Sequence, residues 1–451
     1  MNKAFAGDPY IRKVLEIVDL ISSENDEVDS VFDDITAFFV GDAKSTRQQL
    51  DLKIAISVLQ DKLAEGADSA TDAELQDAIA KLDEAKQADD TSRNRRLAKV
   101  RRLCQMVFDC CEGNSYPETQ QKTAKFLAAL WLIAEQSEAS HQTIHQKLKV
   151  PYKMALTLRL VDEVIRKQIC KVPNWQSFRQ PEARYNEDIE TRKLWYATVA
   201  TPAMIAALFQ DAGLQHPLAL KLLNGADGNA NPFRVLEADE RQSLLKMNYR
   251  FSVDYVTLGL GVDYATDYAT PEQQVIAHAT VLELVKDAYK PKSGIGQILK
   301  IPQIYTSIVL STKPDFSRVD VPKGCALIDQ LGKKGVLNSQ LAEAFNAITG
   351  VFPQGFGINT TKYSGIVLGL NPRKQHEPNV LPLFAKAGYP LAESPQVAHK
   401  IENYYFSETR KQFTPSENEQ IDTLVKQTDT IEPSWLASDA FHDWRAIWQR
   451  Q

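Results

Sequence analysis

Two histidines, His141 and His145, have a spacing that suits metal chemistry. They lie at positions i and i+4 in SHQTIHQ, so on a helix both imidazoles would share one face, an arrangement that can bind zinc. The stretch has no HExxH motif and no obvious third ligand. We therefore interpret the two histidines as part of a plain polar helix face.

A second candidate for chemistry is the stretch AALFQDAGLQHP, in which Gln210 precedes Asp211. A carboxylate can ligate a metal, but the neutral carbonyl of glutamine is a far poorer transition-metal ligand than an imidazole. Asp211 can also simply accept hydrogen bonds from a nearby backbone or from His216. We interpret His216 as a surface or packing histidine.

The composition narrows the class of protein. The 451 residues carry a formal net charge of −6, which argues against a general attraction to nucleic acid. The five cysteines, an odd number without CxxC spacing, favour reduced thiols over disulfides or a zinc ribbon. No apolar stretch approaches the ~20 residues of a membrane span, and the N-terminus does not resemble a signal peptide. We expect a cytoplasmic protein with no membrane span and no nucleic-acid partner.

The elements that must position these residues are mostly helices. Through the first 180 or so residues, apolar side chains recur with helical period, and we expect a bundle of antiparallel helices. The spacing of TDAE, from Thr71 to Glu74, predicts a capping box that opens a helix. The first amphipathic stripe consists of Ile11, Val14, Leu15, Val18 and Ile21.

A strongly basic stretch, TSRNRRLAKVRRLCQMVFDCC, follows within the same region. A basic helix can bind an anionic partner such as a nucleotide phosphate or an acidic protein surface. The acidic run KLDEAKQADD directly before it offers the alternative of a solvated face that is balanced within the chain, and we favour that alternative.

The remaining sequence divides at the polar, proline-containing stretch KVPNWQSFRQPEARYNEDIE. Helical patterns resume and continue to about Gly350. Glycine, proline and β-branched residues then predict a small β-hairpin element over about 351–382. We predict a mainly α-helical chain with three parts: an all-helical N-terminal domain over 1–185, a second helical domain with the β-hairpin over 186–400, and a C-terminal helical tail over 401–451.

The tail carries several large aromatic side chains. Phe441, Trp444 and Trp448 lie at i, i+3 and i+7, and Trp435 precedes them. Three exposed rings on one helical face would promote aggregation. The tail is therefore predicted to dock, either on the body of its own chain, which we favour, or in the groove of a partner.

Four stretches of the second half follow the order of a known family. They are AALFQDAGLQHP, LLNGADGNANPFRVLEADERQSLLKMNYRF, LVKDAYKPKSGIGQILKIPQIYTSIVLSTKPDFSR and AFNAITGVFPQGFGINTTKYSGIVLGLNPRKQHEPNVL. Over about residues 192–383 this sequence resembles the bacterial HD-GYP family of metal phosphohydrolases, which hydrolyse cyclic di-GMP. The last stretch carries the most specific likeness, through Phe352, Pro353, Gly355, Gly365, Val367, Asn371, Pro372, Pro378 and Val380.

The resemblance implies a site for two or three iron or manganese ions, but this sequence lacks most of the expected ligands. Only Asp211 keeps its identity. Gln210 stands where the histidine of the HD pair would be, and Asn248 where a later histidine falls. The other expected ligand positions hold Lys286, Asp287, Ala288, Pro291 and Ile304. We therefore predict no cofactor and no catalytic residue.

Three functions follow from the resemblance. The first, which we favour, is a non-catalytic bacterial signalling or scaffold protein that binds a protein partner through a degenerate HD-GYP-like domain. The second is a receptor that binds cyclic di-GMP or another nucleotide without hydrolysis. The third is an atypical metal-dependent cyclic di-GMP phosphodiesterase, which would need His141, His145, His278, Asp211 and Asp287 to meet in space. Phosphates need nearby cations, and the candidate contacts are Lys286, Lys290, Lys292, Lys300 and Lys313.

Overall fold

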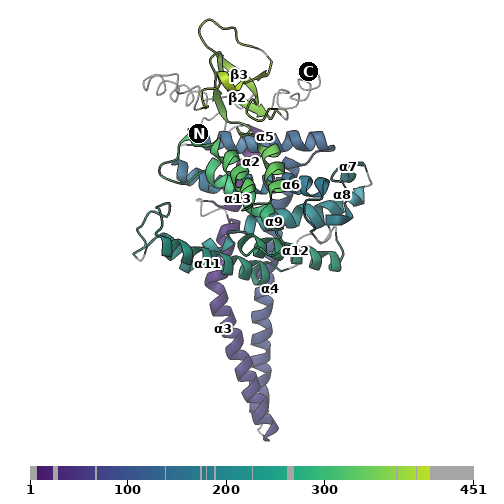
Figure 1. The fold of residues 1–451 in the computed structure, drawn as a ribbon. Helices are drawn as coiled ribbons and strands as arrows, with labels where there is room; N and C mark the ends of the chain where they lie inside the picture. The colour runs from purple at the N-terminus through teal and green to yellow at the C-terminus, as the bar shows by residue number, and fades with distance from the viewer. Residues whose placement is uncertain are drawn as a thin grey trace.

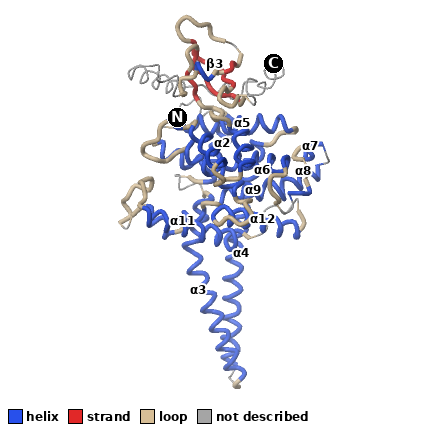
Figure 2. The backbone as a smooth tube through the Cα atoms, in the orientation of Figure 1, coloured by secondary structure: helices blue, strands red, loops and turns tan. Residues whose placement is uncertain are grey.

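The computed structural model shows a helical body with a long hairpin of two helices at one end and a small sheet at the other (Figure 1). Helices dominate the described residues, and the strands found there lie in the C-terminal part (Figure 2). The prediction of a mainly α-helical fold is confirmed. The structure describes residues 8–406 apart from 24–28, 67–68, 138, 173–174, 179, 187–188, 226, 262–268, 372–373 and 393.

The described residues of the N-terminal part form five helices, and their first residues are capped where the flanking residues are described. Asp8 caps the first of them, and Ser30 forms a capping box with Asp33 at the start of the second. Thr71, by contrast, lies inside a continuous helix, so the predicted capping box at TDAE is wrong. The five helices are α2 (Pro9–Ile21), α3 (Val31–Ala64), α4 (Ser69–Cys111), α5 (Tyr116–Gln136) and α6 (His141–Lys167).

Helices α3 and α4 form an antiparallel hairpin that extends well beyond the body (Figure 1). At its far end the two helices pair through apolar side chains, among them the buried Leu75, Ala78 and Leu82 of α4. At its base the hairpin is attached to the body by polar contacts. The guanidinium of Arg96 donates to the carbonyl of Gly259 at 2.8 Å, and Lys99 pairs with Asp34 at 2.7 Å.

The second half adds further helices around α6 and two π-helical turns. The α-helices are α7 (Ala183–Asn186), α8 (Ile189–Trp195), α9 (Thr201–Phe209), α10 (Pro217–Leu223), α11 (Ala238–Asp254), α12 (Pro271–Tyr289), α13 (Gln297–Val309), α14 (Lys323–Lys333) and α15 (Ser339–Thr349). The π-helical turns are η2 (Tyr196–Ala200) and η4 (Tyr255–Leu260), and the short 3-10 segments are η1 (Trp175–Ser177), η3 (Ala212–Gln215), η5 (Arg318–Asp320) and η6 (Lys400–Glu402).

One hydrophobic core runs through both halves. It includes side chains of α2, α4, α5 and α6 together with side chains of α9, α12 and α13. The polar stretch between the halves is attached to this core, because Trp175 and Phe178 are buried and Arg184 pairs with Asp162 at 3.1 Å and also with Glu112. The domain boundary near residue 185 stays a prediction, and the core is continuous across it.

The strands form a four-stranded antiparallel sheet in the order β1-β2-β3-β4, so the predicted hairpin is the centre of a larger element. The strands are β1 (Gly357–Asn359), β2 (Tyr363–Gly369), β3 (Asn379–Ala385) and β4 (Gln396–Val397). Ile366 of β2 faces Leu381 of β3 in the central pair. Gly355, with φ +84°, lies against α5, where a Cβ would come within 2.8 Å of the Cα of Ala128.

Candidate functional site

Asp211 lies directly after the most apolar helix of the body. Every residue of α9 is buried, so the chain reaches Gln210 inside the fold before Asp211 leads into η3. Gly213 permits the close approach of η3 to α11, because a Cβ there would lie 2.4 Å from the carbonyl oxygen of Asn248. The Asp211 carboxylate keeps 29% of its side-chain surface exposed, whereas Gln210 is buried.

A lysine from the N-terminal half is the cationic partner of Asp211. The ammonium of Lys153, on α6, lies 2.9 Å from Oδ2 of Asp211, and the lysine side chain is only 4% exposed. The same ammonium donates to Oε1 of Gln210 at 3.2 Å. Gln210 and Asp211, the two neighbouring residues of the HD-like motif, therefore share the Lys153 ammonium, a cation that the chain itself provides.

Two side-chain amides complete the contacts to the carboxylate. Asn248 of α11 donates to Oδ1 at 3.0 Å. Gln303 of α13 donates to both oxygens, at 2.9 and 3.0 Å. Gln210 in turn donates to Oε1 of Gln303 at 2.8 Å, so the two glutamines are linked.

Tyr289, the last residue of α12, closes the network. Its hydroxyl donates to the carbonyl of Gln210 at 2.7 Å, lies 3.2 Å from Oδ1 of Asp211, and accepts from Asn248 at 2.6 Å. Ser252 binds the same carbonyl at 3.0 Å. Five helices thus meet at one carboxylate, and every described contact to that carboxylate comes from a donor group.

The electrostatics of the site favour an ionised Asp211. Burial alone would raise the pKa of Asp211, but Lys153 and the hydrogen bonds from Asn248 and Tyr289 hold that pKa below its usual value. Lys149, one turn before Lys153, donates to Thr312 at 3.1 Å. Burial lowers the pKa of Lys149 to about 8, and Asp211 opposes that shift.

This arrangement does not fit a di-metal centre. A metal ion needs lone pairs directed at it, yet the amide N–H groups of Asn248 and Gln303 and the Lys153 ammonium all direct hydrogens at Asp211. An ammonium beside the carboxylate would also repel a cation. Within the described part of the chain, no three His, Cys, Asp or Glu side chains gather into a group that could ligate a metal.

Some of the expected ligand positions lie next to Asp211 in the structure, and others do not contact it. Asn248 contacts Asp211, as its place in the family order implies. The helices α12 and α13 contribute Tyr289 and Gln303, whereas the family order implied the adjacent Ala288 and Ile304. Asp287 faces away and accepts from the backbone N–H groups of Lys292, Ser293 and Gly296 at 2.5, 2.8 and 2.7 Å.

Sequence reasoning missed Lys153 altogether. The residue precedes the segment that resembles the family, so no motif drew attention to it. The feature that marks Lys153 is the helix around it. Residues 150–162 of this helix are all buried, and they include the charged Lys153, Arg159 and Asp162. Charged residues inside a helix that is buried on all sides must find partners, and a search for those partners would have led to Asp211.

The candidate lysines separate into different surfaces. Lys286, Lys290 and Lys292 line one groove of about 580 Å³, together with Tyr249 and Glu283. The ammonium of Lys290 lies 4.4 Å from the centre of the Tyr249 ring. Lys313 belongs to a different groove, and Lys300 lines neither.

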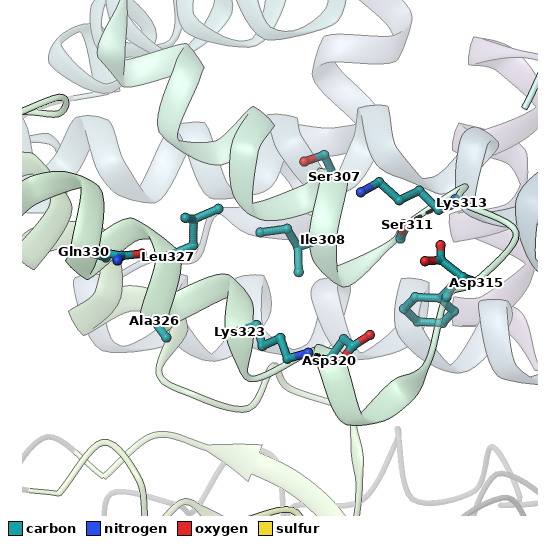
Figure 3. A pocket seen from close by; sticks show the side chains of 11 residues that line it. Ser307, Ile308, Ser311, Lys313, Asp315, Asp320, Lys323, Ala326, Leu327 and Gln330 are labelled. Atoms are coloured by element: carbon teal, nitrogen blue, oxygen red, sulfur yellow. Dashed lines mark hydrogen bonds and ion pairs between the residues drawn. The ribbon is translucent and has the colours of Figure 1, made fainter. Parts of the chain in front are cut away.

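The groove that contains Lys313 lies between α13, α14 and the loop that joins them, and it measures about 770 Å³ (Figure 3). Lys313 and Lys323 line it together with Asp315 and Asp320, and Lys323 pairs with Asp320 at 2.5 Å. Because its charges are balanced, this groove has no evident preference for an anion.

The two histidines with zinc-like spacing have structural partners. Nδ1 of His145 lies 2.8 Å from the carbonyl oxygen of Ser311, and Nε2 of His141 lies 3.0 Å from that of Lys313. Phe316 packs against both rings. His145 is buried, so the expectation of a plain polar face is wrong, and the pair instead attaches the start of α6 to the loop after α13.

His216 is a packing residue, as expected. Its ring stacks on Phe251 with centroids 3.5 Å apart, and its Nδ1 accepts from the backbone of Leu218. The hydrogen bonds to Asp211 come instead from the side chains described above, so neither His216 nor a backbone group is needed to explain that carboxylate.

The basic stretch on α4 is largely paired within the chain. Arg93 pairs with Asp90 of the preceding acidic run, but the other partners lie elsewhere in the fold. Arg95 and Lys99 pair with Asp34 of α3, Lys99 also pairs with Asp29, and Arg102 pairs with Glu16 of α2. The basic residues therefore attach α4 to its neighbours more than they balance the run before them.

Three predictions lie outside the described residues: the helical tail beyond residue 406, its aromatic docking face of Trp435, Phe441, Trp444 and Trp448, and Pro372 of the family-like closing stretch. Among the described residues, no helix combines the length and apolar character needed to cross a bilayer. No family model, no curated protein and no solved structure matches this chain.

Proposed function

We propose that this protein is a non-catalytic cytoplasmic signalling or scaffold protein of bacterial type, whose second half is an HD-GYP-like pseudo-enzyme. One observation carries the proposal: the Lys153 ammonium lies 2.9 Å from Asp211, the one retained residue of the HD-like motif. A built-in cation holds the carboxylate that would otherwise help to bind a metal.

The chemistry of the donors supports the same proposal. A di-metal hydrolase uses its ions to generate a nucleophile from water and to neutralise the phosphate. Lysine, asparagine, glutamine and tyrosine side chains around Asp211 can hold that carboxylate in place, but they supply neither a Lewis acid nor an activated hydroxide. The fold then acts through its surfaces, and a protein partner is the expected ligand.

Metal content and turnover test the proposal directly. The full chain, purified anaerobically under reducing conditions, is expected to carry no stoichiometric iron or manganese and to leave cyclic di-GMP intact with either metal added. Lys153→Ala serves as the matched variant, because it removes the cation without restoring a ligand. About two metals per wild-type chain, or turnover that a chelator abolishes, would falsify the proposal and favour the atypical phosphodiesterase.

A nucleotide receptor is the second candidate, and the groove of Lys286, Lys290 and Lys292 favours it. Its three lysines outnumber its two carboxylates, Glu283 and Asp287, which leaves positive charge for a phosphate, and Tyr249 offers a ring surface for a base. Calorimetry with cyclic di-GMP separates this candidate from the first. Binding that Lys286→Ala and Lys290→Ala weaken, and that Lys300→Ala and Lys313→Ala leave unchanged, would establish the receptor; no heat of binding for the wild type would exclude it for this ligand.

A further inference from the structure

The far part of α3 is apolar on two opposite faces. At about 100° per residue, Leu52, Ile56, Leu59 and Leu63 form one stripe, and Leu50, Ile54 and Val58 form another roughly 180° away. The first stripe is partly buried and faces α4. In the second, which we call the outer stripe, Leu50, Ile54 and Val58 are 54%, 54% and 48% exposed.

An outer stripe of this kind needs an explanation. A surface helix of a monomer normally has one apolar face and a polar face opposite to it. In the outer stripe, branched apolar side chains recur at positions i, i+4 and i+8 on one face of α3. The hairpin that carries them projects beyond the body (Figure 1). Val40, 52% exposed, continues the same face towards the base of the hairpin.

The charges that flank the outer stripe are self-complementary. Arg47 and Asp61 lie on the same face and at equal distances, seven residues, before and after Ile54. If two copies of α3 pack antiparallel about a two-fold axis at Ile54, each Arg47 faces Asp61 of the other copy, and Leu50 faces Val58. Parallel packing would instead place Arg47 against Arg47 and Asp61 against Asp61.

The neighbouring positions agree with the antiparallel arrangement. In that register Asp51 faces Ser57, and Lys53 faces Ala55, so no like charges are opposed. A two-fold interface requires such a pattern, since the same surface must fit its own copy.

We propose that a second copy of this chain covers the outer stripe, forming an antiparallel dimer through the two hairpins. This inference does not depend on whether the second half of the chain binds a metal ion. Because α3 ends at Ala64, the overlap about Ile54 covers residues 44–64 and is about 30 Å long and 11 Å wide, or roughly 700 Å² for both copies together. That area is smaller than the ~1,200 Å² at which standard specific interfaces begin, so the dimer is weak and reversible.

Sedimentation velocity of the full chain over roughly 1–200 µM tests the dimer. The wild type shifts from monomer to dimer as its concentration rises. Ile54→Asp places two carboxylates face to face at the axis and weakens association about 100-fold or more. The control Gln48→Asp adds a carboxylate to an exposed position away from the stripe and leaves the equilibrium unchanged. Circular dichroism melting confirms that both variants fold.

Charge exchange and cross-linking test the orientation. Arg47→Glu weakens the dimer and Arg47→Glu combined with Asp61→Arg restores it. When Leu50→Cys and Val58→Cys chains are mixed and oxidised, they cross-link to each other in preference to themselves. A wild type that stays monomeric at the highest concentration, a dimer that Ile54→Asp leaves intact, or cross-links only between like variants would each overturn the proposal.

Discussion

At the scale of single residues, an ammonium ion differs from a metal ion in what it offers a carboxylate. Lys153 supplies one positive charge and hydrogen-bond donors, and it cannot accept a lone pair from water as a Lewis acid does. Its contacts to Asp211 and Gln210 hold two helices together, since the lysine belongs to α6 and its partners follow α9. The pair therefore has a structural consequence that mutation can measure.

Replacing Lys153 by methionine should destabilise the protein by about 2–4 kcal/mol, because the mutation leaves a largely buried carboxylate without its cation. The value lies towards the lower end because Asp211 remains partly exposed. Asp211→Asn in the same background should recover part of the loss, since a neutral amide needs no counter-ion. Urea unfolding of the four proteins in this double-mutant cycle measures the coupling, and additive losses would show that the pair is not coupled.

His145 should make stability depend on pH in mildly acidic solution. Burial lowers the pKa of His145 to about 4, while the unfolded chain has the ordinary value near 6.5. The unfolded state therefore binds a proton first, and the free energy of unfolding falls as pH drops from about 6.5 towards 4, by up to roughly 3 kcal/mol. His145→Gln should flatten this part of the profile, and an identical slope in wild type and variant would contradict the assignment.

At the scale of elements, the site depends on close packing between α12 and α13. Gly296, the residue before α13, lies so near α12 that a Cβ would come within 2.0 Å of the backbone nitrogen of Ala288. Its own N–H donates to Asp287 at 2.7 Å. The two helices that supply Tyr289 and Gln303 are therefore joined where they meet.

Gly296→Ala should separate α12 from α13 and destabilise the protein by about 2–4 kcal/mol, as overpacking against a rigid backbone does. Gly41→Ala is the matched control: a Cβ on this helical glycine of α3 would meet nothing within 4 Å, so alanine should stabilise slightly. Thermal melting ranks the two variants. A Gly296→Ala protein as stable as the wild type would refute the packing argument.

Helix periodicity also explains how much of the site the sequence could predict. Apolar stripes such as that of Ile11, Val14 and Val18 identify helices reliably, because burial repeats along them. A ligand position is harder, since an error of one residue rotates a side chain by about 100°. The family order implied Ala288 and Ile304, and the side chains that reach the site are the adjacent Tyr289 and Gln303.

At the scale of the whole molecule, the hardest feature to predict was the contact between the two halves. Lys153 and Asp211 are separated by 58 residues, and they meet because α6 and α9 pack together in one core. Local patterns predict helices and caps, but the pairing of distant helices depends on the shape of the entire core. The hairpin shows the same limit, because helical periodicity over residues 69–111 predicts a helix but does not show that α4 pairs with α3.

The covalent attachment of Lys153 to the chain has a thermodynamic consequence. A protein that binds a free ion in its native state gains stability with the concentration of that ion and loses it to a competitor, by RT ln(1 + [L]/Kd). Lys153 is instead present at fixed stoichiometry in every molecule, so its contribution to stability does not depend on the concentration of any free ion. We expect the melting temperature to be the same with manganese, without it, and with a chelator in excess. Differential scanning calorimetry provides the measurement, and a rise of several degrees with manganese would show that an ion binds the native state after all. We therefore expect the contact between Lys153 and Asp211 to be insensitive to the metal concentration around the protein.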